Sequence, residues 1–89
     1  MDIDHQIALR LRSRRRLLGM TLQEVAELSD TSFQMVQKYE LGMTRVSAAR
    51  LWTLAQALRV EVGYFFESLE PRPRPAERAP GARERALLN

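Results

Sequence analysis

The chain has 89 residues, which is enough for one small domain and excludes a second globular one. It contains no cysteine, so disulfides and thiolate metal sites are excluded, and a reducing, cytoplasmic setting is expected. The formal net charge of +3 belongs to residues 71–89, because the basic and acidic groups of residues 1–70 balance. A polyanionic partner must therefore be argued from where the basic groups lie. No signal peptide or membrane-spanning stretch is expected.

The first predicted helix runs from about residue 4 to 18. Ile7, Leu11 and Leu18 fall on one apolar stripe, and Gly19 is expected to end the helix in a left-handed conformation. The segment Arg10-Leu-Arg-Ser-Arg-Arg-Arg16 concentrates basic groups on this helix. Such a cluster is compatible with nucleic acid but does not establish it.

A second helix is predicted at about 22–29. Thr21, with Glu24 three residues later, forms the pattern of a capping box, in which each side chain satisfies a backbone N–H of the first turn.

A tight turn then leads to a third helix, predicted at about 33–41. Asp30 tolerates a positive φ, Thr31 or Ser32 can cap the third helix, and Gly42 closes it. Two short helices joined in this way are the outline of a DNA-reading helix-turn-helix.

The remaining predicted elements complete a compact all-α domain of five helices over residues 1–70. Ser47 caps a fourth helix, whose core-facing residues follow the 3.6-residue period, and residues 60–69 form a short apolar fifth helix. Residues 71–89 hold all four prolines and are expected to form a flexible Pro/Arg-rich tail. The core-facing residues of the fourth helix are Leu51, Leu54, Ala55 and Leu58.

The third helix has an inward face with Val36 and Tyr39 and a polar outward face. Gln34 suits a bidentate contact with adenine, Lys38 can donate to guanine acceptors or a phosphate, and Phe33 can lie against a thymine methyl. The alternative is that these side chains only solvate an exposed helix.

Several segments of residues 7–69 resemble the lambda-repressor-like (Cro/XRE) helix-turn-helix family. The similar segments are Leu11-Arg-Ser-Arg-Arg-Arg-Leu-Leu-Gly-Met-Thr, Glu24-Val-Ala-Glu, Val36-Gln-Lys-Tyr-Glu-Leu-Gly and Arg50-Leu-Trp-Thr-Leu-Ala-Gln-Ala-Leu-Arg-Val. The resemblance implies a regulator that binds double-stranded DNA.

Carried over residue by residue, the resemblance makes Phe33, Gln34 and Lys38 the base-contacting positions. It also implies an ion pair between Arg15 and Glu40 that orients the third helix. Further DNA-backbone or auxiliary contacts are expected from Gln23, Ser32, Gln37, Thr44, Arg45 and Arg16.

The sequence departs from the family pattern at two places. Leu22 stands where the family usually has a phosphate-binding glutamine, and Asp30-Thr31 replace a glycine and a small apolar residue in the turn. Leu22, together with the balanced charge of residues 1–70, favours an alternative function in which the fold serves protein interaction, as an antitoxin or adaptor that binds its partner through Phe33 and the aromatic last helix.

A homodimer is expected, because one such domain contacts few base pairs. Tyr64, Phe65 and Phe66 are too many aromatics for so small a core, so we predict a dimer interface there, with Trp52 as a further contact. The alternative is that two of them face inward and the third lies under the tail.

No catalytic constellation, cofactor motif or metal-spaced cluster is found in the sequence, so an enzyme is not expected. The tail of residues 71–89 is expected either to add non-specific DNA affinity or to bind RNA polymerase or another regulator.

Overall fold

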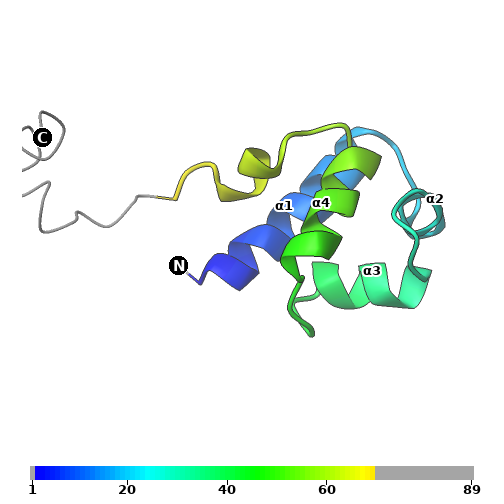
Figure 1. The fold of residues 1–89 in the computed structure, drawn as a ribbon, viewed down its shortest axis with the longest axis horizontal. Coiled ribbons are helices and arrows are strands. Elements are labelled where there is room, and N and C mark those ends of the chain that lie inside the picture. Colours follow the sequence, from blue (N-terminus) through cyan, green and yellow to red (C-terminus); the bar gives the residue numbers. More distant parts are fainter. Residues whose placement is uncertain (1, 70–89) are drawn as a thin grey trace, which may run out of the picture.

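The computed structural model describes residues 2–69 as a helical domain (Figure 1). It contains the helices α1 (Ile3–Leu17), α2 (Leu22–Leu28), α3 (Phe33–Glu40) and α4 (Ala48–Ala57), followed by the 3₁₀ helix η1 (Val62–Phe66). α2 packs against α3 and α4, while α1 packs against α3 and η1. In Figure 1, α2 and α3 lie at the end of the domain opposite the amino terminus.

The prediction of five α-helices is wrong for the last segment. Residues 62–66 form a 3₁₀ helix, in which Tyr64 N–H bonds the Glu61 carbonyl at 3.0 Å, three residues back. This geometry is common in short pieces, and Glu61 provides no side-chain cap. The predictions for residues 71–89 lie outside the described residues.

Each α-helix begins at a side-chain cap, which explains why the sequence located their starts closely. Asp2, Thr21, Ser32 and Ser47 each accept a backbone N–H from the first turn of the helix they precede. Both halves of the capping box at Thr21 are present at 3.0 Å. Such a cap contributes about 1 kcal/mol to helix stability.

Each α-helix is followed by a residue with positive φ: Gly19, Asp30, Gly42 and Arg59. The next N–H then bonds a carbonyl five residues back, as Met20 does to Arg15 at 3.0 Å. These are Schellman endings, which satisfy carbonyls that the helix leaves unpaired. A residue other than glycine costs about 1–2 kcal/mol in this conformation, although aspartate tolerates it.

The core lies between the four α-helices and η1 and follows the predicted apolar stripes. Ile7, Val36 and Tyr39 are buried as predicted, and the fully buried side chains include Leu11, Val25, Leu54, Leu58 and Phe65. All four predicted core positions of α4 are buried. Among residues 2–69, no helix is both long and apolar enough to cross a membrane.

Candidate nucleic-acid interface

The outward face of α3 carries the side chains that the sequence assigned to base reading. Gln34, Gln37 and Lys38 are exposed, and in the described part of the chain none of them makes a side-chain hydrogen bond. Phe33 is 42% exposed at the first position of the helix. The amide and ammonium groups are therefore available to a partner, in an orientation that the buried Val36 and Tyr39 fix from behind.

The start of α3 is fixed by Ser32, whose hydroxyl accepts the N–H of Met35 at 3.2 Å. The Ser32 side chain therefore caps the helix in this structure. Its hydroxyl hydrogen remains available to an acceptor outside the domain.

The far end of α3 is tied to α1 by an ion pair between Arg15 and Glu40. Nε and Nη2 of Arg15 donate to the two carboxylate oxygens at 2.7 and 2.9 Å, and Nη1 donates to the Met20 carbonyl at 3.0 Å. The Arg15 and Glu40 side chains are only 14% and 6% exposed. The hydrogen bond with Glu40 raises the pKa of Arg15, against the lowering effect of burial. This bidentate geometry fixes direction as well as distance, so it holds α3 at a set angle to α1.

The basic cluster of α1 is divided between internal and outward roles. Arg14 donates to the Leu58 carbonyl at 3.0 Å, at the end of α4. Arg10 donates to the Glu67 carbonyl at 3.3 Å, and its guanidinium carbon lies 4.9 Å from the centre of the Tyr64 ring. Together with Arg15, these residues hold the fold, so much of the cluster is structural.

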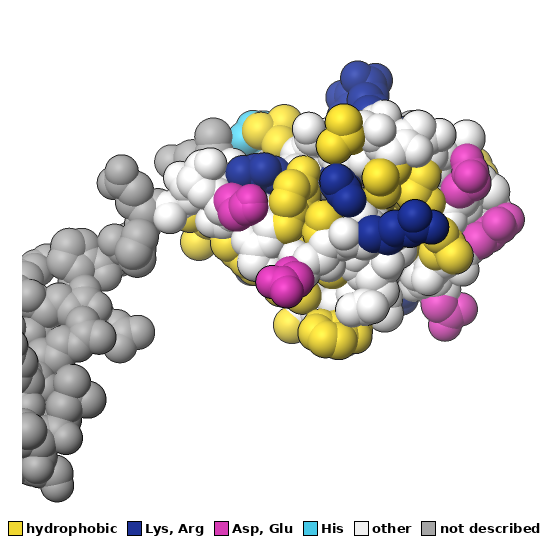
Figure 2. All heavy atoms as spheres, turned by 90° about the horizontal axis from the view of Figure 1, so that it is seen from above, with side chains coloured by type: hydrophobic (Ala, Val, Ile, Leu, Met, Phe, Trp, Pro, Cys, Tyr) yellow, Lys and Arg dark blue, Asp and Glu magenta, His cyan; other side chains and the backbone are white. Residues whose placement is uncertain are grey.

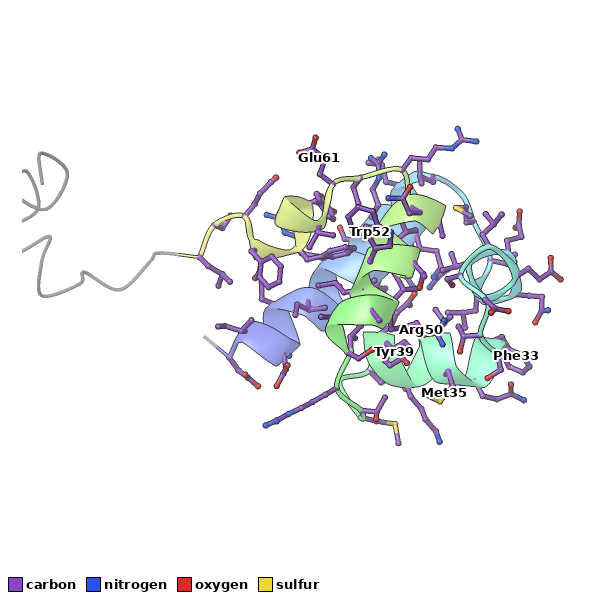
Figure 3. All side chains as sticks on the ribbon, viewed as in Figure 1. Phe33, Met35, Tyr39, Arg50, Trp52 and Glu61 are labelled. Atoms are coloured by element: carbon purple, nitrogen blue, oxygen red, sulfur yellow. The ribbon has the colours of Figure 1, made fainter. Side chains whose placement is uncertain are left out.

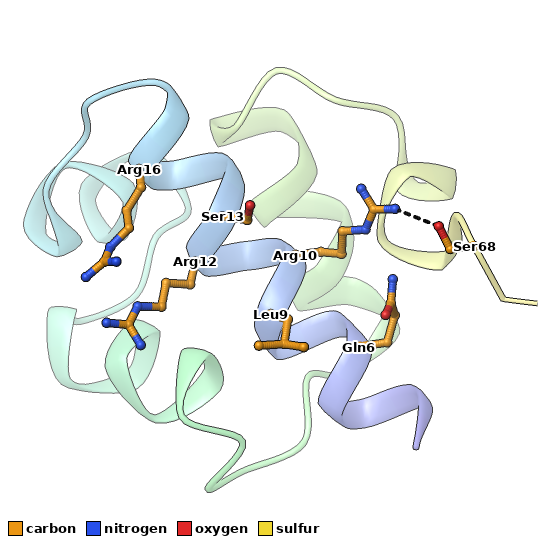
Figure 4. Close-up of a pocket in the computed structure, with 7 residues that line it drawn as sticks. All are labelled: Gln6, Leu9, Arg10, Arg12, Ser13, Arg16 and Ser68. Atoms are coloured by element: carbon orange, nitrogen blue, oxygen red, sulfur yellow. Dashed lines mark hydrogen bonds between the residues drawn. The ribbon is translucent and has the colours of Figure 1, made fainter. Parts of the chain in front are cut away.

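Arg12 and Arg16 remain exposed, one helical turn apart on the outer face of α1. They border an open groove of about 690 Å³ that runs along α1 (Figure 4). Arg12 also borders a smaller hollow of about 150 Å³ that includes Gln37 of α3. The full lining of the larger groove is Gln6, Leu9, Arg10, Arg12, Ser13, Arg16 and Ser68.

The other predicted auxiliary residues lie in less favourable settings. The Gln23 amide donates to the Glu27 carboxylate at 3.1 Å along α2. Arg45 lies 3.3 Å from Asp4 of α1, in an exposed ion pair of the kind that contributes little to stability. Thr44 is half-buried beside Arg45 in the loop before α4.

Acidic side chains gather over α2, at one end of the molecule (Figure 2). The exposed acidic residues of this region are Glu24, Glu27 and Asp30. The exposed residues of α3 are neutral except for Lys38, and the one acidic residue of α3, Glu40, is engaged by Arg15. The outward face of α3 is therefore more suitable for a polyanion than that of α2.

The aromatic segment places its side chains in three different environments. Phe65 is fully buried and stacks edge-on against Tyr64, with ring centres 5.4 Å apart. The prediction that Phe65 lies in a dimer interface is therefore wrong, because its side chain belongs to the core. Tyr64 is half-buried, whereas Phe66 is 37% exposed and Trp52 on α4 is 60% exposed.

Arg50 is a candidate functional residue to which the sequence analysis assigned no role. It lies in the first turn of α4 and donates hydrogen bonds to the Ser29 and Asp30 carbonyls in the turn between α2 and α3. A cation in the first turn of a helix opposes the helix dipole. An arginine at this unfavourable position is the one feature of the sequence from which a separate role for Arg50 could have been predicted.

Two short helices joined by a tight turn, with the second helix presenting a polar face, define a helix-turn-helix domain. The Helix-turn-helix family matches residues 11–65, and the chain belongs to this family, in its lambda-repressor-like branch.

The curated relatives of the chain are named as transcriptional regulators. It is 45% identical over 65 residues to an HTH-type transcriptional regulator of Sinorhizobium medicae, covering 73% of this chain and 47% of that protein. It is 43% identical over 68 residues to a transcriptional regulator in the ATPase CF(0) region of Rhodospirillum rubrum, covering 76% and 63%. The chain thus spans about half to two-thirds of the length of these relatives.

Two solved structures have a similar fold. The restriction-modification controller protein C.AhdI from Aeromonas hydrophila superposes with a TM-score of 0.69 at 30% identity, covering 71% of this chain and 96% of that one. The clp gene regulator ClgR from Corynebacterium glutamicum gives a TM-score of 0.70 at 28% identity, covering 81% and 99%. The fold of this chain is therefore one that known regulators use.

Proposed function

We propose that the chain is a sequence-specific DNA-binding transcription regulator of the cytoplasm that places α3 in the major groove. The observation that carries this proposal is the outward face of α3, where Gln34 and Lys38 are exposed and without hydrogen-bond partners in the described domain. Glutamine and lysine are suited to adenine and guanine edges, and Phe33 is placed to contact a thymine methyl. The relatives named as transcriptional regulators support the same interpretation.

Phosphate contacts would come from residues beside α3. Arg12 borders both the α1 groove and the hollow next to Gln37, so it extends the basic surface from α3 onto α1. Arg16 continues that surface by one turn. Such contacts position a protein on DNA and carry little sequence information. Further contacts with the DNA backbone are assigned to Ser32, Thr44 and Arg45. The Gln23 amide could join them only after its hydrogen bond to Glu27 breaks.

The first test selects bound fragments from random double-stranded DNA and titrates the best one at several salt concentrations. A palindromic sequence with a steep salt dependence is expected. Replacing Lys38 with alanine should weaken binding to that fragment by about 1–3 kcal/mol and alter the preferred base at one position. Selection that enriches no sequence would refute the proposal, and equal weakening on all sequences would reduce Lys38 to a phosphate contact.

The regulator is proposed to act as a homodimer on two half-sites about 34 Å apart. Phe66 and Trp52, with the half-buried Tyr64, supply exposed apolar surface for the interface. Phe66→Glu should lower the mass measured by gel filtration at micromolar concentration to that of a monomer. Leu28→Glu is the control, because it places the same charge at an exposed apolar position of α2, 64% exposed against 37% for Phe66, and it should leave the mass unchanged. An unchanged mass for Phe66→Glu would exclude this interface.

A second candidate function is protein interaction by an antitoxin or adaptor. Leu22 in place of a phosphate-binding glutamine and the acidic surface of α2 favour it. Weak salt dependence of DNA binding, together with a partner that co-purifies in fixed ratio, would support this function over the first.

Residues 71–89 are proposed to add non-specific DNA affinity or to bind RNA polymerase or another regulator. Deleting them should reduce non-specific DNA affinity in the first case alone, because their charge of +3 would no longer attract phosphates.

A further inference from the structure

Arg50 links α4 to the turn that joins α2 to α3. In Figure 3 its side chain lies between α4 and that turn. Nη1 donates to the carbonyls of Ser29 and Asp30, the latter at 3.2 Å. In the described part of the chain these two oxygens accept no backbone N–H. The guanidinium therefore supplies charge-assisted hydrogen bonds, which are stronger than neutral ones.

The turn itself is one that must be held in place. Asp30 has a φ of 56°, in the left-handed region, and residues 29–32 include no glycine. Ser29 is buried, and its hydroxyl donates to the Val25 carbonyl. Aspartate tolerates this conformation better than most residues, but it still costs free energy relative to glycine, so surrounding contacts are needed to favour it. The double contact of Arg50 provides such a constraint from outside the two helices.

The other end of the link is anchored in the core through α4. The backbone N–H of Arg50 bonds the capping hydroxyl of Ser47 at 3.1 Å, and the next residue, Leu51, is buried. Leu54, one turn further along α4, is fully buried. Because α4 is packed into the core, the hydrogen bonds of Arg50 fix the turn before α3 relative to the core.

We propose that Arg50 is a positioning residue that sets the direction of α3 relative to the rest of the domain. Its consequence for DNA rests on the proposed function. A recognition site must hold its side chains within about 0.5 Å and 10–20° of the productive geometry. Phosphate contacts tolerate larger changes in the position of α3, because they depend mainly on charge. Loss of Arg50 therefore lowers specific affinity more than non-specific affinity.

The experiment compares Arg50→Gln and Arg50→Lys with the full chain and with Arg59→Gln. The control removes the same charge from an exposed position just after α4. Without DNA, amide hydrogen exchange is measured by NMR for the Thr31 N–H, which bonds Ala26, and for core amides of α1. With DNA, the ratio of affinities for the selected fragment and for random DNA is measured at one salt concentration.

Arg50→Gln should accelerate Thr31 exchange about tenfold, leave α1 unchanged, and lower the specific-to-non-specific ratio about tenfold, as expected for loss of a charged hydrogen bond. Arg50→Lys, which keeps the charge, should recover part of both effects, and Arg59→Gln should alter neither.

Two results would overturn the proposal. One is unchanged Thr31 exchange in Arg50→Gln and Arg50→Lys. The other is faster exchange with an unchanged affinity ratio, which would separate the turn from DNA reading. Under the first result, an equal fall in specific and non-specific affinity would identify Arg50 as a phosphate contact instead. A wild-type chain without sequence preference would refute the proposed function, and the exchange measurement alone would then decide whether Arg50 holds the turn.

Discussion

Replacing Arg15 with methionine is expected to destabilise the domain by about 3 kcal/mol, at the lower end of the loss seen when one partner of a buried ion pair is removed. The value follows from the burial of the pair, since the Glu40 side chain is 6% exposed and would lose its cation. Arg15 is itself 14% exposed, which places the estimate at the lower end. Domains of this kind have a total stability of about 5–15 kcal/mol, so the loss would be large.

Glu40→Met should cost less than Arg15→Met, because the guanidinium would keep its hydrogen bond to the Met20 carbonyl at 3.0 Å. The double variant should be far more stable than the sum of the two losses predicts, since an apolar pair carries no unpaired charge. We expect a coupling energy of about 2 kcal/mol between the two sites.

Urea unfolding followed by circular dichroism measures these differences for the wild type, both single variants and the double variant. Arg16→Met, on the exposed neighbour of Arg15, is the control and should change stability by no more than about 0.5 kcal/mol. A loss below about 1 kcal/mol for Arg15→Met, or simple additivity in the double variant, would refute the reasoning.

Three further changes test the fold. Phe65→Ala should cost about 3–5 kcal/mol, because the side chain is fully buried, and a loss below about 1 kcal/mol in urea unfolding would contradict its place in the core. Arg59→Gly should gain about 0.5 kcal/mol, since relief of strain at a φ of 57° exceeds the entropy that glycine adds to the unfolded chain. Thermal unfolding checks this change, and a lower melting temperature would count against it. Hydrogen bonds from the backbone and side chain of Thr21 lower the pKa of Glu24. The stabilisation from a carboxylate with a lowered pKa is present above its unfolded pKa, about 4.3, and is lost as pH falls through the folded value. Unfolding free energy should therefore decrease more on acidification for the wild type than for Glu24→Gln, and parallel pH profiles would exclude this effect.

The helix boundaries could be predicted because local chemistry specifies them. Serine and threonine caps mark the starts of α2, α3 and α4, and Gly19 and Gly42 mark the ends of α1 and α3. The predicted bounds of α1 to α3 therefore differ from the observed ones by about a residue, and Ser47 caps α4 as predicted. The conformation of residues 60–69 could not be predicted in this way, because an apolar run is compatible with both α and 3₁₀ geometry. Phe65 of this segment is fully buried in the core, a long-range contact that the local pattern does not contain.

The roles of individual arginines could not be predicted from the sequence. Arg10, Arg14 and Arg50 bond backbone carbonyls that are distant along the chain, and only the folded geometry brings these groups together. Periodicity predicted which side of α3 faces outward, because Val36 and Tyr39 fix it. The same periodicity could not predict which of Tyr64, Phe65 and Phe66 is buried, because a short 3₁₀ segment does not follow the α-helical period.

The contact between Gln6 and the Glu67 carbonyl, at 3.0 Å, brings the beginning and end of the described domain together. Both ends lie on the side of the molecule away from α2 (Figure 1). A pair of fluorescent dyes attached near Asp2 and Leu69 would consequently report folding by energy transfer, which is high in the native state and falls when the chain expands. A surface tether attached at either site would also leave α3 facing the solution.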